Sequence, residues 1–164
     1  GVAAFLTGEL AEDGGASLGY LLHSYLGLSL ASIVLIRILI GFTSSQILSF
    51  KGWSPFSKQQ WKFTLEDLHT LLSLKVPERD SHQGLAGLTH AFGLLVFLWM
   101  SITGTALFMI VPGVDRDIFE FVEEIHELGE SLIPLFLALH IGAVLLHTLS
   151  GKAIWNRMFN FKSS

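Results

Sequence analysis

The chain has 164 residues, of which 51% are hydrophobic and only 15% charged, and its net charge at pH 7 is -4. Soluble domains carry about 25% charged residues, so this composition excludes an ordinary soluble globular domain. The chain has no cysteine, which excludes disulfides, zinc–thiolate sites, iron–sulfur clusters and c-type haem attachment. Its Lys and Arg residues are scattered, so no nucleic-acid-binding surface is expected.

Three long apolar runs predict membrane-spanning helices. They are Leu18–Phe42, in which Arg37 is the single formal charge, Gly84–Val111 and Leu132–Gly151. About 20 apolar residues cross a hydrocarbon core of about 30 Å, and each run must be helical because lipid offers backbone groups no hydrogen-bond partner. The apolar segment Gly1–Leu6 is too short to span. We interpret it as the last turns of a helix whose beginning is absent, with a mobile apolar terminus as the alternative.

The predicted fold is therefore an all-α transmembrane four-helix bundle whose first helix is incomplete. In chain order we expect the end of the first span at 1–8, the second span at 16–43, a cytoplasmic loop with a surface helix at 44–82, the third span at 84–111, a periplasmic loop at 112–122, the fourth span at 123–151 and a cytoplasmic tail at 152–164. The surface helix is predicted because Trp61, Leu65, Leu68 and Leu72 have helical spacing before Pro77. Such an amphipathic helix is typical of a membrane surface.

Charge predicts the orientation of these spans. The basic residues of the 44–82 loop and of the C-terminal tail are Lys51, Lys58, Lys62, Lys75, Arg79, Lys152, Arg157 and Lys162. The opposite side has Arg116 and an acidic series of Glu9, Glu12, Asp13, Asp115, Asp117, Glu120, Glu123 and Glu124. Because basic residues stay in the cytoplasm, the loop and the C-terminus are predicted to be cytoplasmic.

Histidines are the candidate functional residues, because an ionisable residue inside a membrane span is expected to be functional. His126 and His140 are 14 residues apart, which is about 40° short of four helical turns and about 21 Å along the helix axis. This spacing suits two haems, one above the other, with imidazoles as axial ligands. His23 is predicted to lie at the depth of His126 on an antiparallel helix and to face it. Gly27, one turn after His23, would leave room for a flat macrocycle and let helices pack closely.

Other charged or ionisable residues have more than one interpretation. Arg37 returns to the face of His23 at the inner level, where it would bind a propionate of the second haem or extend to the headgroups. His147 would bond a propionate, a quinone or the inner headgroups. His90 is either a quinone-site residue or a packed histidine. A zinc-protease motif beginning at His126 is weak, because Glu130 stands where the second histidine is needed.

Several segments resemble the bacterial cytochrome b561 family, which groups with the nickel–iron hydrogenase b-type cytochromes. The segments are Leu22–Gly27, Leu35–Phe42, Ser81–Gly87, Glu124–Leu128 and Leu139–Ala143 with His147. The resemblance implies four helices, two b-type haems and electron transfer between the quinone pool and a redox partner. It implies one haem between His23 and His126, and another between His140 and a first-span histidine. This chain has no such histidine, so we expect it to precede Gly1.

The predicted function is a membrane-bound b-type cytochrome that transfers electrons across the bacterial inner membrane. Two imidazoles per iron leave no open coordination site, which favours electron transfer over oxygen chemistry. The expected partners are quinone or quinol, a periplasmic hydrogenase or c-type cytochrome, and membrane lipid; a homodimer is left open. The alternatives are a non-redox transporter subunit with an intramembrane histidine relay and a metal carrier that uses the same histidines.

Overall fold

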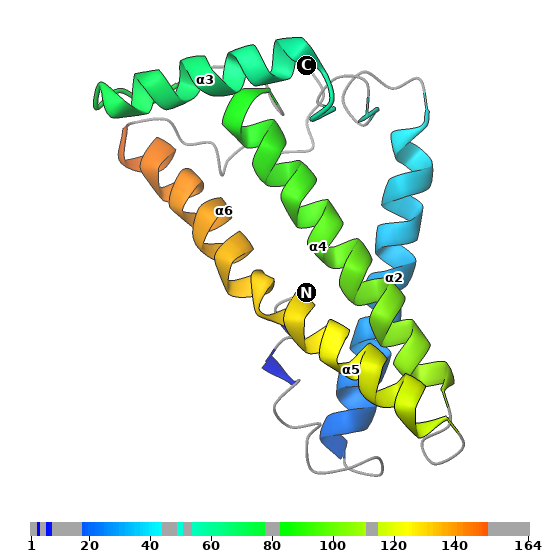
Figure 1. Cartoon of the computed structure of the whole chain (residues 1–164). Helices are drawn as coiled ribbons and strands as arrows, with labels where there is room; N and C mark the ends of the chain where they lie inside the picture. The colour runs from blue at the N-terminus through cyan, green and yellow to red at the C-terminus, as the bar shows by residue number, and fades with distance from the viewer. Residues whose placement is uncertain are drawn as a thin grey trace, which may run out of the picture. The chain divides into compact units, whose positions relative to one another are not determined.

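The computed structural model describes residues 3, 6–7, 18–43, 49–50, 54–77, 83–110 and 115–150. Over these residues the secondary structure is helical and contains no strand, which confirms the predicted all-α class. Figure 1 shows the elements in chain order: α2 (Leu18–Gly41), α3 (Lys58–Leu72), α4 (Gly84–Met109), α5 (Arg116–Glu130) and α6 (Leu132–Leu149).

Three stretches are long and apolar enough to cross a membrane: α2, α4, and the Arg116–Leu149 stretch formed by α5 and α6. The three predicted spans are therefore present as helices. Helix α2 ends at Gly41, where Phe42 and Thr43 close the last turn by donating to the carbonyls of Leu39 and Ile40. Many apolar side chains of these helices are exposed, as is expected where lipid covers them.

The last helical stretch begins earlier than its predicted start at residue 123. It starts at Arg116, inside the segment 112–122 that was predicted to be a loop. The Nε of Arg116 donates to Glu120 Oε1 at 2.7 Å, four residues on, and the Phe119 N–H donates to the Asp115 carbonyl at 2.9 Å. Pairs at this spacing stabilise a helix, so the acidic residues that suggested a loop belong to an amphipathic first segment.

The chain divides into two compact units, which are described separately. The first consists of residues 1–49 and 92–134, and the second of residues 50–91 and 135–164. The first unit thus contains α2, most of α4 and all of α5. The second contains α3, the first turns of α4 and most of α6.

Close contact between α4 and α5 holds the first unit together. The indole Nε1 of Trp99 donates to the carbonyl of Ile125 at 3.0 Å. A Cβ added at Gly129 would lie 2.7 Å from the Sδ of Met100 and 3.1 Å from the Trp99 ring. Glycine is therefore the residue that lets these two helices approach, and Val96 and Ile133 are buried in the same unit.

In the second unit, α3 packs on the start of α4 through polar side chains. Gln60 donates from Nε2 to the Gly84 carbonyl at 2.9 Å and accepts the Gly84 N–H at Oε1 at 3.3 Å. Asp67 Oδ2 accepts the Leu85 N–H at 3.0 Å, so α3 satisfies backbone groups that a helix start leaves without an intrahelical partner. Gly84 has a φ of 62°, and a Cβ there would overlap the Asp67 carboxylate.

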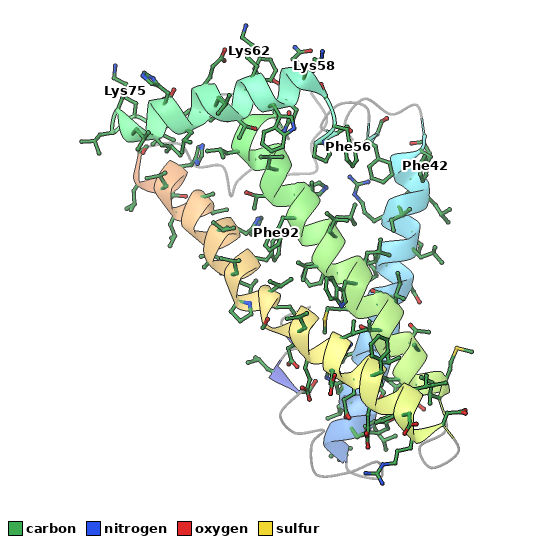
Figure 2. The ribbon with its side chains drawn as sticks, viewed as in Figure 1. Phe42, Phe56, Lys58, Lys62, Lys75 and Phe92 are labelled. Atoms are coloured by element: carbon green, nitrogen blue, oxygen red, sulfur yellow. The ribbon has the colours of Figure 1, made fainter. Side chains whose placement is uncertain are left out.

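The predicted surface helix is present in α3, and the structure shows which of its sides meets the protein. The buried side chains of α3 are Gln60, Thr64 and Asp67, whereas the apolar residues Trp61, Leu65, Leu68 and Leu72 are exposed. Lys58 and Lys62 point away from α4 (Figure 2). The polar side of this amphipathic helix therefore faces the protein.

Some predicted features lie outside the described residues. At the start of the chain only Ala3, Leu6 and Thr7 are described, and the Thr7 N–H donates to the Ala3 carbonyl at 3.2 Å, as in one helical turn. The other residues outside the description include His82, Lys51, Arg79, the acidic residues Glu9, Glu12 and Asp13, and the tail with Lys152, Arg157 and Lys162.

Candidate functional site

His23 and His126 come together in the first unit. His23 is on α2 and His126 is on α5, and both side chains are half-buried. Their ring centroids are 6.2 Å apart, and the ring planes are nearly perpendicular, at 85°. The spacing of histidines along the chain predicted that these two would face each other, and the structure brings them together.

Thr103 of α4 is the third polar member of this group. Its Oγ1 lies 2.7 Å from His126 Nδ1 and donates to the Trp99 carbonyl at 2.9 Å. Donation to the carbonyl four residues earlier is the usual bond of a helical threonine, and it uses the single hydroxyl hydrogen. We therefore assign the Nδ1–H of His126 as the donor to Thr103, which leaves the lone pair on Nε2.

Glycines shape the space around the two rings. A Cβ added at Gly104 would lie 3.1 Å from His126 Cε1, so any side chain there would press on the imidazole. Gly27 differs, because an added Cβ would meet nothing within 4 Å. The absence of a side chain at Gly104 makes room for His126, whereas Gly27 borders open space.

The geometry of the His23–His126 pair fits two axial ligands of one metal ion. A metal–imidazole nitrogen bond is about 2 Å long, so two rings on opposite sides of one metal have centroids about 6 Å apart. A metal-ligating histidine also usually donates its other ring N–H to an oxygen, as His126 does to Thr103. Over the described ranges no group of three or more His, Cys, Asp or Glu could hold a metal ion. Two protein ligands suit a metal whose other ligands come from a macrocycle, as in haem.

His140 and His147 are on α6 in the second unit. The exposed His140 ring stacks on Phe136, one turn earlier, with centroids 5.6 Å apart and an angle of 24° between the planes. The Nδ1–H of His147 donates to the Ala143 carbonyl at 2.8 Å. In the described part of this unit, the ring contact shown for His140 is this stacking on Phe136.

The remaining predicted site residue of the first unit, Arg37, is half-buried on α2, fourteen residues after His23. Sequence reasoning missed Thr103 and Gly104. In the sequence, the one feature that marks Thr103 is that it is a polar residue in an uncharged span. The same feature is shared by Thr89, Ser101 and Thr105.

Comparison with known proteins identifies the family of the chain. A family model described as prokaryotic cytochrome b561 matches residues 1–161, which is nearly the whole chain. No curated protein and no solved structure matches the chain. With its three membrane-spanning helical stretches, the chain therefore belongs to the prokaryotic cytochrome b561 family of membrane b-type cytochromes, which bind haem b and transfer electrons.

Proposed function

We propose that this protein carries electrons across the bacterial inner membrane between the quinone pool and a periplasmic redox protein, either a hydrogenase or a c-type cytochrome. The observation that carries the proposal is the His23–His126 pair, whose 6.2 Å centroid separation suits coordination of one haem iron from both sides. Family membership supports the haem and the electron transfer.

In this proposal the protein holds and orients the cofactor. His23 and His126 would hold one haem b by its iron, and Thr103 would hold the His126 ring with Nε2 available for that iron. Gly27 gives the macrocycle space on α2. When bound, haem b supplies a one-electron carrier, and with both axial positions filled by imidazole it has no open site for oxygen.

A second haem at His140 completes the proposal. His140 supplies one axial imidazole on α6, and its second ligand lies outside the described residues. Arg37 and His147 are the candidates to bind propionates by charge-assisted hydrogen bonds, and His147 is also a candidate for binding quinone. Two haems on the two sides of the bilayer would allow electrons to cross it.

The proposed orientation places α3 on the cytoplasmic side and the Asp115 end of α5 on the periplasmic side. It rests on the basic residues of the 44–82 loop. The chain has no native cysteine, so single cysteines can be introduced cleanly. In sealed cells an impermeant thiol reagent should label Asp117→Cys and leave Lys58→Cys unlabelled; the reverse pattern would refute the orientation.

Haem content tests the function itself. The purified full-length protein, which includes the histidine that the resemblance implies for the second haem, should show sharp α and Soret bands on reduction, and a pyridine haemochrome assay should give about two haems per chain, each with two axial side chains. His23→Ala and His126→Ala should each lower this ratio to about one, as should His140→Ala. His69→Ala is the matched control, because His69 is exposed on α3, and it should keep the full content.

The same measurements separate the alternatives. A transporter subunit with a histidine relay would be colourless in all variants, and so would a metal carrier that holds a bare divalent ion. An unchanged haem content in both His23→Ala and His126→Ala would leave the cytochrome family intact but reject this ligand pair.

A further inference from the structure

We infer that Thr103 is a positioning residue that sets the orientation and the electron-donating strength of His126. The inference rests on the proposed function, because it assumes that His126 ligates a haem iron. It begins from a short contact, 2.7 Å, between Thr103 Oγ1 and His126 Nδ1 in a span that has no formal charge. Thr103 is itself buried, with 9% of its surface exposed.

The direction of this hydrogen bond follows from the helix. Thr103 Oγ1 donates to the Trp99 carbonyl at 2.9 Å, so the same oxygen accepts from His126. An imidazole that donates from Nδ1 is a more basic ligand at Nε2. A more basic ligand stabilises the oxidised iron and lowers the reduction potential of the haem. Thr103 therefore acts on the iron through His126, without touching it.

The contact also fixes the ring in space. The Trp99 indole donates to the carbonyl of Ile125, the residue before His126, and Gly104 next to Thr103 leaves 3.1 Å between a hypothetical Cβ and His126 Cε1. One stretch of α4 thus binds the backbone next to His126 through Trp99, lies against the imidazole at Gly104, and accepts the ring N–H at Thr103. A rotation of the ring would break the Thr103 bond and move Nε2.

A set of three variants tests the inference. Thr103→Val removes the hydroxyl and keeps the shape, Thr103→Ser keeps the hydroxyl, and Thr89→Val is the matched control. Thr89 lies on the same α4 and donates to the carbonyl four residues earlier at 3.0 Å, as Thr103 does. The readouts are the midpoint potential of the haem that His126→Ala removes, and its ferric EPR g-values.

Thr103→Val should raise that potential by roughly 30 mV, which is about a threefold change in the one-electron equilibrium at 59 mV per factor of ten. Thr103→Ser and Thr89→Val should stay close to the parent protein. If Thr103→Val loses this haem while Thr103→Ser keeps it, the hydroxyl is needed to orient His126 and the inference also stands. If Thr103→Val keeps both the haem and the parent potential, the inference is wrong although the proposed function survives. A parent protein without haem would instead reject the proposed function.

A second and independent inference concerns α3, which does not take part in the histidine site. We propose that one flank of α3 lies in the lipid headgroup layer and that Lys58 and Lys62 bind anionic headgroups. The flank consists of Trp61, Leu65, Leu68 and Leu72, whose exposed fractions are 53%, 65%, 47% and 77%. Both lysines fall within about a quarter turn of it on the helical projection.

The position of α3 argues for lipid as the occupant of this flank. Gln60 and Asp67 tie α3 to Gly84 and Leu85, the first residues of α4. The 26 residues of α4 span about 39 Å, more than the hydrocarbon core of about 30 Å. The start of α4, and α3 with it, therefore lies at headgroup level. An apolar flank bordered by lysines is the pattern of interfacial helices that bind anionic lipid.

Spin labels measure this placement in the full-length protein reconstituted in vesicles of phosphatidylcholine and phosphatidylglycerol. A nitroxide at Leu65→Cys should be more accessible to oxygen than to a water-soluble nickel chelate, whereas one at Gln59→Cys, on the opposite flank, should show the reverse. Equal, high nickel accessibility at both sites would overturn the proposal. So would a Leu65→Cys label shielded from both reagents, since protein and not lipid would then cover the flank.

The anionic preference has its own readout, the enrichment of phosphatidylglycerol over phosphatidylcholine in the lipid that co-purifies with the protein. Each basic residue near an anionic surface contributes about 1 kcal/mol. Replacing Lys58→Gln together with Lys62→Gln should therefore lower the enrichment at the headgroup site of each lysine roughly fivefold. An unchanged enrichment would reject the role of these two lysines.

Discussion

His126 and His140 lie fourteen residues apart in one helical stretch, yet their surroundings differ. The His126 ring is half-buried, donates to Thr103 and has the His23 ring 6.2 Å away. The His140 ring is exposed and stacks on Phe136 of its own helix. Position on one helical stretch therefore does not decide the surroundings of a histidine, because the partners of His126 come from other helices whereas the stacking partner of His140 lies on its own helix.

The difference shows which contacts hold an imidazole ring in place in a membrane-spanning helix. For His126 the fixing groups are supplied by α4 and α2: an acceptor at Thr103, a small residue at Gly104 and a second imidazole at His23. For His140 the described contact is local, four residues away. A contact within one helix moves with that helix and does not fix its position. A contact with another helix fixes the position of the ring relative to the rest of the protein.

The largest expected effect on the comparison of His126 with His140 is the loss of haem from a variant at Gly27. An added side chain there meets no protein atom within 4 Å, so Gly27→Leu should leave the fold intact. If the open space is filled by a haem between His23 and His126, Gly27→Leu should remove that haem and lower the ratio from about two to about one.

Ser29→Leu is the control for this prediction, because Ser29 is exposed on α2 and lies about 200° around the helix from Gly27. Haemochrome assays and circular dichroism on both variants give the answer. A Gly27→Leu protein that keeps its full haem content would show that the space beside His23 belongs to lipid or to another helix.

The spans and the histidine pair were predictable from sequence, because each rests on a pattern within one helix. Apolar runs with at most one formal charge predicted α2 and α4, and their positions at the outer ends of antiparallel spans predicted comparable depths for His23 and His126. The contacts between helices were not predictable. Nothing separates Thr103 from Thr89 in the sequence, since both are threonines in the same uncharged run, and only the packing of α4 on α5 distinguishes them.

The start of α5 shows a different limit. The acidic residues of the 112–122 segment favour a loop outside the membrane, because charge is typical of connecting segments. Charge excludes a segment from lipid but does not stop it from being helical, and Arg116 and Glu120 pair across one turn. In α3 polarity is likewise no guide to which residues pack inside the protein, since the side of this helix that is buried is polar.

An intermediate effect is expected at the contact between α3 and α4. Gln60→Leu removes the acceptor for the Gly84 N–H and the donor to the Gly84 carbonyl. Leaving buried backbone groups without partners costs about 1–3 kcal/mol, so the free energy of unfolding in a denaturing-detergent titration should fall by about that amount. Gln59→Leu, at an exposed neighbouring position, should change it little. The haem proposed for His23 and His126 would belong to the other unit, and its potential should not move in either variant.

The smallest effect is expected at Trp99. A variant there distinguishes the hydrogen bond to the α5 backbone at Ile125 from the hydrogen bond to the His126 ring. Trp99 donates to the Ile125 carbonyl at 3.0 Å but does not bond His126. Trp99→Phe keeps an aromatic ring against Gly129 and removes this one hydrogen bond, so it should cost about 1 kcal/mol of unfolding free energy. Thr103 still accepts from His126 in this variant, so the haem content and potential should stay near those of the parent protein. A potential shift as large as that of Thr103→Val would mean that the position of the α5 backbone, and not the acceptor on Nδ1, sets the electronic state of the ligand.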